Sequence, residues 1–219
     1  MSIATLILGE SGTGKSASIR NLDPTDTLLI QAVKKPLPFK STEWKFANKE
    51  NPDGAIFVTD KSDVIVAAMA RTKKSVIVID DFQYTMSNEF MRRVLDKETG
   101  NAAFAKYNEI ARSAWDILNA ASNLPDNKRV YILSHTQTDE SGHTKIKTIG
   151  KLLDEKITIE GLVTIVMRTH CINEKNVFST KNSGNDTVKC PMGLFDETHI
   201  DNDLAVVDAA IFEYYNLKN

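Results

Sequence analysis

The sequence has little net charge, few cysteines and no long hydrophobic run, and each of these features excludes a class of protein. Its 27 Lys and Arg residues nearly balance its 29 Asp and Glu residues, which gives a formal net charge of −2. Nucleic-acid binding would therefore need a local basic patch, because the average surface is not basic. No apolar stretch approaches the length of a membrane span, and the strand expected from residue 3 leaves no room for an export signal.

The sequence contains two cysteines, Cys171 and Cys190, and the expected absence of an export signal bears on their redox state. In a chain without an export signal they are expected to be reduced, buried thiols. A zinc site would need more ligands at metal-binding spacings, and these spacings are not provided by His170, Cys171, Cys190 and His199. The cysteines therefore predict neither a disulfide nor a zinc site.

The 219 residues, 42% of them hydrophobic and 26% charged, are typical of one globular domain covering residues 1–219. Apolar runs alternate with helical patterns, which predicts an α/β fold with a mostly parallel central sheet flanked by helices. The expected strands are Ile3–Leu8, Thr27–Ala32, Ala55–Val58, Ser75–Asp80, Arg129–Ser134 and Leu162–Thr169. The expected helices are Lys15–Arg20, Lys61–Ala70, Ala102–Ala121, Ile149–Glu160 and, at the C-terminus, Asp203–Tyr215.

Beyond Thr169 the pattern changes. The segments Val177–Ser179 and Asp186–Cys190 flank a turn-rich stretch, which predicts a C-terminal β-hairpin at the edge of the sheet. Two loops stand out: Val33–Asn51, which is rich in Lys and Pro, and Thr136–Lys147.

A complete phosphate-binding loop follows the first expected strand. Residues 9–16 are Gly-Glu-Ser-Gly-Thr-Gly-Lys-Ser, in which Gly9 and Gly14 let the backbone N–H groups curl around phosphate oxygens. Lys15 is expected to reach the β- and γ-phosphates, and the Ser16 hydroxyl to ligate Mg²⁺. The N-terminus of the following helix adds partial positive charge. The predicted contacts to ATP are Gly9, Glu10, Ser11, Gly12, Thr13, Gly14, Lys15, Ser16 and Ala17.

Two later strands end in polar residues that suit the same site. The buried run from Val76 ends in Asp80 and Asp81, and we expect Asp80 to hold Mg²⁺ and Asp81 to orient a water. The run from Val130 to Leu133 continues into polar residues at the expected edge of the sheet. Any one of three could sense the γ-phosphate there: His135, Thr136 or Gln137.

Together these features resemble the RecA-like fold of phosphate-loop ATPases, and more closely the small phage-encoded ATPases of the Sak type. The resemblance spans nearly the whole chain, through Gly9–Ser16, Lys35–Phe39, Val76–Asp81, Ser134–Gln137, Lys147–Glu155 and Lys189–Phe195. Sak-type proteins are RecA-like cores associated with single-strand annealing and recombination. The resemblance implies an ATPase that uses ATP and Mg²⁺ in the cytoplasm of a bacterial host cell.

The resemblance also implies where single-stranded DNA binds. In RecA-like proteins, mobile loops follow the acidic strand and the sensor strand, which correspond here to Phe82–Ala103 and Thr136–Gly150. The expected phosphate contacts are the basic residues in or beside these loops, Arg92, Arg93, Lys145, Lys147 and Lys151. For these segments, a solvated surface loop is the alternative interpretation.

Lysines late in the RecA core reach the γ-phosphate of the adjacent subunit, and Lys189 occupies a similar place here. A cation supplied from a neighbouring subunit stabilises charge on the transferring phosphoryl group. Lys181 and Arg168 are the alternatives for this role. Lys189 could also be a lysine at the sheet edge that faces solvent and has no catalytic role.

The chain departs from the RecA pattern at two points. RecA-like ATPases often carry a water-activating Glu after the second strand, and Ile30–Lys35 contains no acid, so slow turnover is expected without DNA or a partner. The N-terminal element that links RecA protomers is also missing, which leaves a ring, a filament or no oligomer open. The resulting prediction is a phage recombination ATPase that binds single-stranded DNA in a nucleotide-dependent way, with a phage single-strand-binding protein as a further partner. The alternative is a nucleotide switch or loader that acts on a protein and does not touch DNA.

Overall fold

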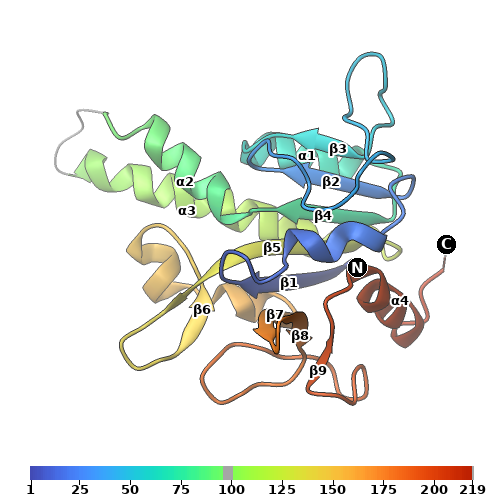
Figure 1. Ribbon diagram of the computed structural model, residues 1–219. Helices are drawn as coiled ribbons and strands as arrows, with labels where there is room; N and C mark the ends of the chain where they lie inside the picture. The colour runs from blue at the N-terminus through green and yellow to red at the C-terminus, as the bar shows by residue number, and fades with distance from the viewer. Residues whose placement is uncertain (96–100, 219) are drawn as a thin grey trace.

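The computed structural model describes residues 1–95 and 101–218, with the backbone alone for residues 101–103. Its described residues form a nine-stranded sheet in the order β3-β2-β4-β5-β1-β7-β8-β9, with β6 paired to β5 outside this path (Figure 1). The strands are β1 (Ile3–Gly9), β2 (Thr27–Gln31), β3 (Ile56–Val58), β4 (Val76–Asp80), β5 (Arg129–Thr138), β6 (Thr144–Ile146), β7 (Ile165–Ile172), β8 (Lys175–Ser179) and β9 (His199–Asp201).

Helices cover both faces of the sheet, as its buried parallel strands require. The helices are the 3₁₀ helix η1 (Ser16–Asn21), α1 (Ser62–Arg71), α2 (Gln83–Arg92), α3 (Asn101–Ser122), the π-helix η2 (Leu152–Lys156), the 3₁₀ helix η3 (Ile159–Leu162) and α4 (Leu204–Tyr214). Helices α1, α2 and α3 pack on one face, where Ile65, Met86 and Ile117 are buried against alternate residues of β1, β4 and β5. Helices η1 and α4 cover the other face.

Each of the six core strands overlaps its predicted range, although β7 begins and ends three residues later than the prediction Leu162–Thr169. Strands β1, β2, β3, β4, β5 and β7 are mutually parallel, with β5 between β1 and β4. This arrangement is the expected α/β fold with a mostly parallel central sheet flanked by helices, and it brings the C-terminal ends of β1, β4 and β5 to one edge. No helix among the described residues is long and apolar enough to cross a membrane.

The predicted loop Phe82–Ala103 is wrong over its first half, because residues 83–92 form α2. Phe82, Met86 and Phe90 lie at four-residue steps and face the core, a helical spacing that the sequence contained. Part of this predicted loop, residues 96–100, lies outside the described residues.

The second predicted loop, Thr136–Gly150, is also wrong in part, because β5 runs on to Thr138 and pairs with β6 as an antiparallel hairpin. The expected helix at Ile149–Glu160 is instead two short helices, η2 and η3.

The edge hairpin exists, but its partners differ from those predicted. β8 pairs antiparallel with β7, and the segment Asp186–Cys190 makes only isolated bridges, such as the one from Lys189 to Val166. The positive φ values of Asn173 and Glu174 make the tight β7–β8 turn, a backbone conformation that sequence spacing did not reveal. Cys171 lies beside this turn and is exposed, so the expectation of two buried thiols fails for it; both cysteines are free.

Candidate nucleotide-binding site

The phosphate-binding loop leaves the sheet at the C-terminal end of β1. Gly9 is paired with His135 of β5 and lies so close to β7 that a Cβ built on it would be 1.9 Å from Thr169 Oγ1. At the other end of the loop, Gly14 has a φ of +96° and passes under Asn176 of β8. A side chain at either position would displace the loop.

The helix after the loop has the six residues that the sequence predicts, shifted by one position, but it is a 3₁₀ helix and not an α-helix. Ile19 of this helix, η1, is buried against the sheet. The partial charge expected from a helix N-terminus is correspondingly small, because few peptide dipoles are aligned.

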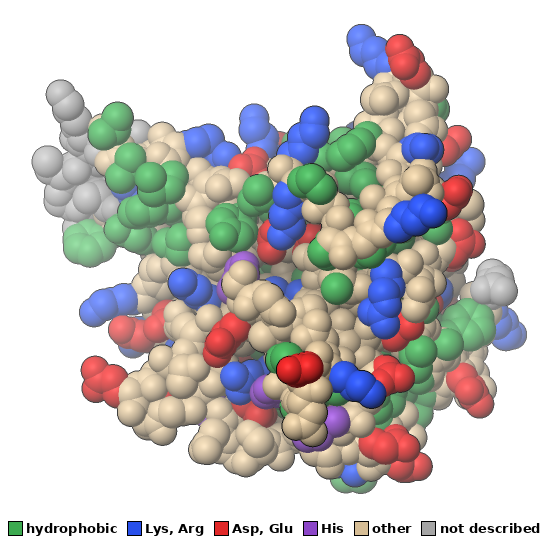
Figure 2. Space-filling model, viewed as in Figure 1, with side chains coloured by type: hydrophobic (Ala, Val, Ile, Leu, Met, Phe, Trp, Pro, Cys, Tyr) green, Lys and Arg blue, Asp and Glu red, His purple; other side chains and the backbone are tan. Residues whose placement is uncertain are grey.

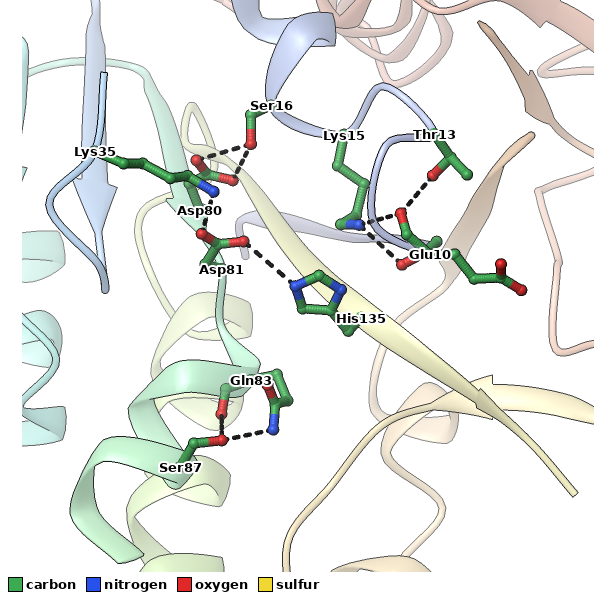
Figure 3. A network of polar contacts seen from close by, with 11 residues as sticks. Glu10, Thr13, Lys15, Ser16, Lys35, Asp80, Asp81, Gln83, Ser87 and His135 are labelled. Carbon is green, nitrogen blue, oxygen red and sulfur yellow. Dashed lines mark hydrogen bonds and ion pairs between the residues drawn. The ribbon is translucent and has the colours of Figure 1, made fainter. Parts of the chain in front are cut away.

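The Lys15 side chain is folded back over the loop. It is 6% exposed, and its Nζ donates to the carbonyl oxygens of Gly9 (2.9 Å) and Glu10 (2.8 Å) (Figure 3). Burial lowers the pKa of Lys15 to about 8, although Asp81 and Asp80 oppose the change. A phosphate in the loop would offer this ammonium group a stronger partner than two carbonyls.

Ser16 and Asp80 meet on the other side of the loop. The Ser16 hydroxyl lies 2.9 Å from Asp80 Oδ1 and 3.0 Å from Oδ2, across 64 residues of sequence. Asp80 is 1% exposed, and burial, with a further contribution from Asp81, raises its pKa to about 6. A hydroxyl and a carboxylate are hard oxygen ligands, so the pair fits Mg²⁺, and a cation there would restore the ionised form of Asp80.

Asp81 lies at the centre of a second polar group. It has a φ of 63°, is buried, and accepts a hydrogen bond from Lys35, while His135 Nε2 lies 3.7 Å from its Oδ1. Burial would by itself lower the pKa of Lys35, but the bond to Asp81 outweighs it and raises that pKa. Burial and the nearby Lys15 lower the pKa of His135, which favours a neutral imidazole at pH 7.

All of these groups except Asp80, which lies behind Ser16, line a cavity of about 480 Å³. The predicted residues on its wall are Ser11, Gly12, Gly14, Lys15, Ser16, Ala17, Asp81 and His135. Sequence reasoning missed the others: Val33, Lys35, Pro36, Pro38, Tyr84 and Asn176. Lys35 to Pro38 belong to a segment that the resemblance had marked, but no sequence pattern placed it beside the phosphate loop.

The three candidates on the β5 strand end point in different directions. His135 lines the cavity and stacks edge-on against Tyr84, with 5.8 Å between ring centroids. Gln137 instead donates to Asp154 of η2, and Thr136 does not line the cavity. The structure therefore brings His135, and not its two neighbours, to the site.

The residues predicted to bind DNA lie outside this cavity, and most have acidic partners. Arg92 contacts Asp60 at 2.6 Å, and Arg93 lies within 4 Å of both Glu89 and Glu109. In the β5–β6 region, the partners are Asp154 for Lys145, at 2.9 Å, and Glu155 for Lys151, at 3.9 Å. Lys147 is exposed and, within the described residues, has no ion pair.

Lys189 lies away from the cavity. It is exposed on the sheet edge, and its backbone pairs with Val166, three residues before the level of Thr169 beside the phosphate loop. Lys189 does not line the cavity of its own chain. Its proposed action on the nucleotide of a neighbouring subunit stays a prediction.

Comparison with known proteins found no family model and no curated protein that matches the chain. The solved structures that are similar include two viral proteins. The genome packaging NTPase B204 of Sulfolobus turreted icosahedral virus 2, in complex with ATPγS, is 9% identical with a TM-score of 0.37, covering 84% of this chain and 78% of that one. The P4 protein of bacteriophage phi6, in complex with ADP, is 15% identical with a TM-score of 0.34, covering 81% of this chain and 57% of that one.

The chain's own geometry therefore defines its class. The phosphate loop after β1, the acid at the end of β4 and the intervening β5 give it a P-loop NTPase fold.

Proposed function

We propose that this protein binds Mg²⁺ and ATP and hydrolyses the nucleotide. The observation that carries the proposal is the contact between the Ser16 hydroxyl and the Asp80 carboxylate beside the buried Lys15. Lys15 would neutralise the β- and γ-phosphates, and Ser16 and Asp80 would hold the metal, which supplies charge stabilisation at the transferring phosphoryl group. The buried carboxylate of Asp81, beside His135, would orient the attacking water.

Turnover is expected to be slow in the isolated protein. Asp81 is already engaged by Lys35, so it is a poorer acceptor for a water proton than a free carboxylate. Breaking the ion pair between Lys35 and Asp81 would raise the rate of hydrolysis. A DNA strand or a partner subunit that moves Lys35 would break it.

We further propose that nucleotide state controls binding to single-stranded DNA during phage DNA recombination in a bacterial host. The resemblance of the sequence supports this function, and so does the path from the cavity to the surface. His135 lines the cavity, its carbonyl accepts from Lys147 N at 2.8 Å, and Lys147 is exposed beyond it. A strand end that would contact the nucleotide thus continues directly into the β5–β6 hairpin and the exposed Lys147 after it.

The ion pairs of Arg92, Arg93 and Lys145 favour a second candidate function. Paired cations give up part of their attraction for phosphate, which suits a nucleotide switch or loader that acts on a protein partner. The two functions differ in one simple property, because only the first predicts that the purified protein alone binds single-stranded DNA.

The test measures phosphate release from ATP with Mg²⁺, with and without single-stranded DNA. Wild-type protein should release phosphate slowly and faster with DNA, while Ser16→Ala should lose the Mg²⁺-dependent activity. Ser122→Ala, which removes a hydroxyl bonded to a helix carbonyl far from the cavity, is the matched control and should behave as wild type. Activity in Ser16→Ala equal to that of the control would refute the site.

A further inference from the structure

The loop between β2 and β3 combines basic and aromatic side chains beside the nucleotide cavity. We call residues 33–51 the basic loop, because it holds five lysines and two glutamates in a chain whose net charge is −2. From residue 33 to residue 40 its side chains alternate between partly buried and exposed positions. The inner set includes Lys35, Leu37 and Phe39, and the outer set includes Lys34 and Lys40. The loop therefore has one side toward the protein and one toward solvent.

The outer lysines are free to bind phosphate. Four are exposed, and in the part of the chain that the structure describes none has a carboxylate within 4.0 Å: Lys34, Lys40, Lys45 and Lys49. Arg92, Arg93 and Lys145 all have such a partner. A lysine without an ion pair gives up no carboxylate partner when it meets a phosphate, so the basic loop is the better electrostatic surface.

An exposed aromatic ring lies among these lysines. Phe46 is 42% exposed, and Lys34 Nζ lies 5.4 Å from its ring centroid. The backbone beneath the ring is fixed to the sheet edge, because Ala47 N donates to Ile56 O at 2.7 Å and Ile56 N donates to Lys45 O at 2.9 Å. A ring held in this way is a platform on which a nucleic-acid base can stack.

A groove continues this surface around the sheet edge. It encloses about 580 Å³ between the loop and the end of α1, and its walls include Ala47, Phe57, Arg71 and Lys73. Arg71 and Lys73 are exposed and have no ion pair among the described residues. Figure 2 shows basic side chains over the part of the molecule around β3 and the loop that rises above it, among hydrophobic and acidic ones.

The same loop also forms part of the wall of the proposed nucleotide cavity. The partly buried Lys35 and the exposed Pro36 and Pro38 line this cavity. Lys35 is also bonded to Asp81 (Figure 3). Gln31 Nε2 also donates to the Lys35 carbonyl at 3.2 Å, which ties the loop to the end of β2. A nucleotide that contacts this wall would restrict the loop, whose outer side carries the free lysines.

We propose that the outer face of the basic loop, with Phe46 and the adjoining groove, binds single-stranded DNA. The lysines track the phosphate backbone and Phe46 stacks with a base, which suits a single strand because bases in a duplex are already stacked. The inference rests on the proposed DNA-binding function and places it on a different surface from the β5–β6 hairpin. Nucleotide dependence then follows from the shared loop.

The experiment follows the fluorescence anisotropy of a labelled oligothymidylate across a series of NaCl concentrations, with and without Mg²⁺ and ATPγS. Lys34, Lys40 and Lys45 are changed together to Gln, which keeps the aliphatic stems and removes the charges. The slope of log affinity against log salt should shrink by up to about 2, the value for three phosphate contacts to a single strand. Phe46→Ala should weaken binding about fivefold or more, and Phe46→Trp should retain it.

The triple Gln variant of Lys145, Lys147 and Lys151 tests the competing hairpin surface. The matched control is the triple Gln variant of Lys61, Lys156 and Lys218, three exposed lysines outside both surfaces, which should keep the wild-type slope. Thermal unfolding of every variant reports whether it is folded, and the exposed positions make loss of folding a poor explanation for lost binding. A loop variant with wild-type affinity and slope, next to a weakened hairpin variant, would overturn the inference and leave the DNA-binding function intact. Absence of any single-strand binding by the wild type, or stronger binding to RNA or duplex of the same sequence, would overturn both.

Discussion

Replacement of Asp80 by Asn should stabilise the nucleotide-free protein while it destroys the metal site. Asp80 is 1% exposed, and burial, with Asp81 beside it, raises its pKa from 3.8 to about 6. Because the folded-state pKa lies above the unfolded-state value, the folded protein binds more protons in this window, and its stability falls as the pH rises through it. The penalty is absent below pH 3.8 and complete above about pH 6.

The expected size follows from that difference. A change of one pKa unit corresponds to about 1.4 kcal/mol, so the buried charge costs the wild type about 3 kcal/mol at neutral pH. The amide of the Asp80→Asn variant would keep an oxygen to accept the Ser16 hydroxyl, so the hydrogen bond survives the substitution. Asp80→Asn should therefore raise the free energy of unfolding by up to about 3 kcal/mol above pH 6, and the gain should shrink steadily as the pH falls toward 4.

Urea unfolding without nucleotide or Mg²⁺, at several pH values, measures this gain. Asp196→Asn is the control, because Asp196 is exposed and its substitution should give neither a gain nor a pH trend. With Mg²⁺ and ATP at one thousand times the Kd the order should reverse, since the ligand then stabilises the wild type by about 4.1 kcal/mol and the variant has lost the metal ligand. An Asp80→Asn protein that is less stable than wild type at every pH would refute the account of this carboxylate.

Three further predictions concern the rate, the subunit interface and the core. Asp81→Asn should lower kcat of ATP hydrolysis with little change in KM, because a water-orienting group acts mainly in the transition state; steady-state kinetics decide, and an unchanged kcat would exclude the role. If Lys189 acts on a neighbouring subunit, a mixture of inactive Lys15→Ala and Lys189→Ala proteins should recover part of the activity, whereas full activity of Lys189→Ala alone with DNA would rule it out. Asp208→Ala should cost about 3 kcal/mol in urea unfolding, since it leaves the buried Arg129 without the carboxylate that it contacts at 2.7 Å; Asp208→Asn, which keeps an acceptor, should cost less, and equal losses would argue against the ion pair.

The part of the site that sequence predicted consists of a motif with fixed spacing after a strand and an acid at the end of another strand. Gly9 to Ser16 and Asp80 were placed because a phosphate loop and a buried parallel strand have fixed patterns, and parallel strands end at a common edge. Their contact, 64 residues apart in sequence, follows from that edge.

The remaining part of the site depends on irregular segments, and no sequence pattern specifies the path that these segments follow. Lys35 reaches Asp81 because an irregular loop folds back over the end of β2, and Asn176 covers Gly14 because of a tight turn at residues with positive φ. Helix α2 is a different kind of miss, because its apolar spacing was present and only the RecA resemblance suggested a loop. Arg92 and Lys145 were predicted to contact DNA phosphates, and no sequence pattern indicated that Asp60 and Asp154 would pair with them.

The central claim is that Lys15 and its loop bind the phosphates of ATP, and calorimetric titration of the purified protein with Mg²⁺ and ATP tests it most directly. Wild-type protein should bind one nucleotide per chain, and Lys15→Ala should bind at least about tenfold more weakly, on the order of 1.4 kcal/mol. Lys61→Ala, the loss of an exposed lysine away from the loop, is the control and should bind as wild type does. Equal affinity for ATP in wild type and Lys15→Ala would contradict the assignment of the site.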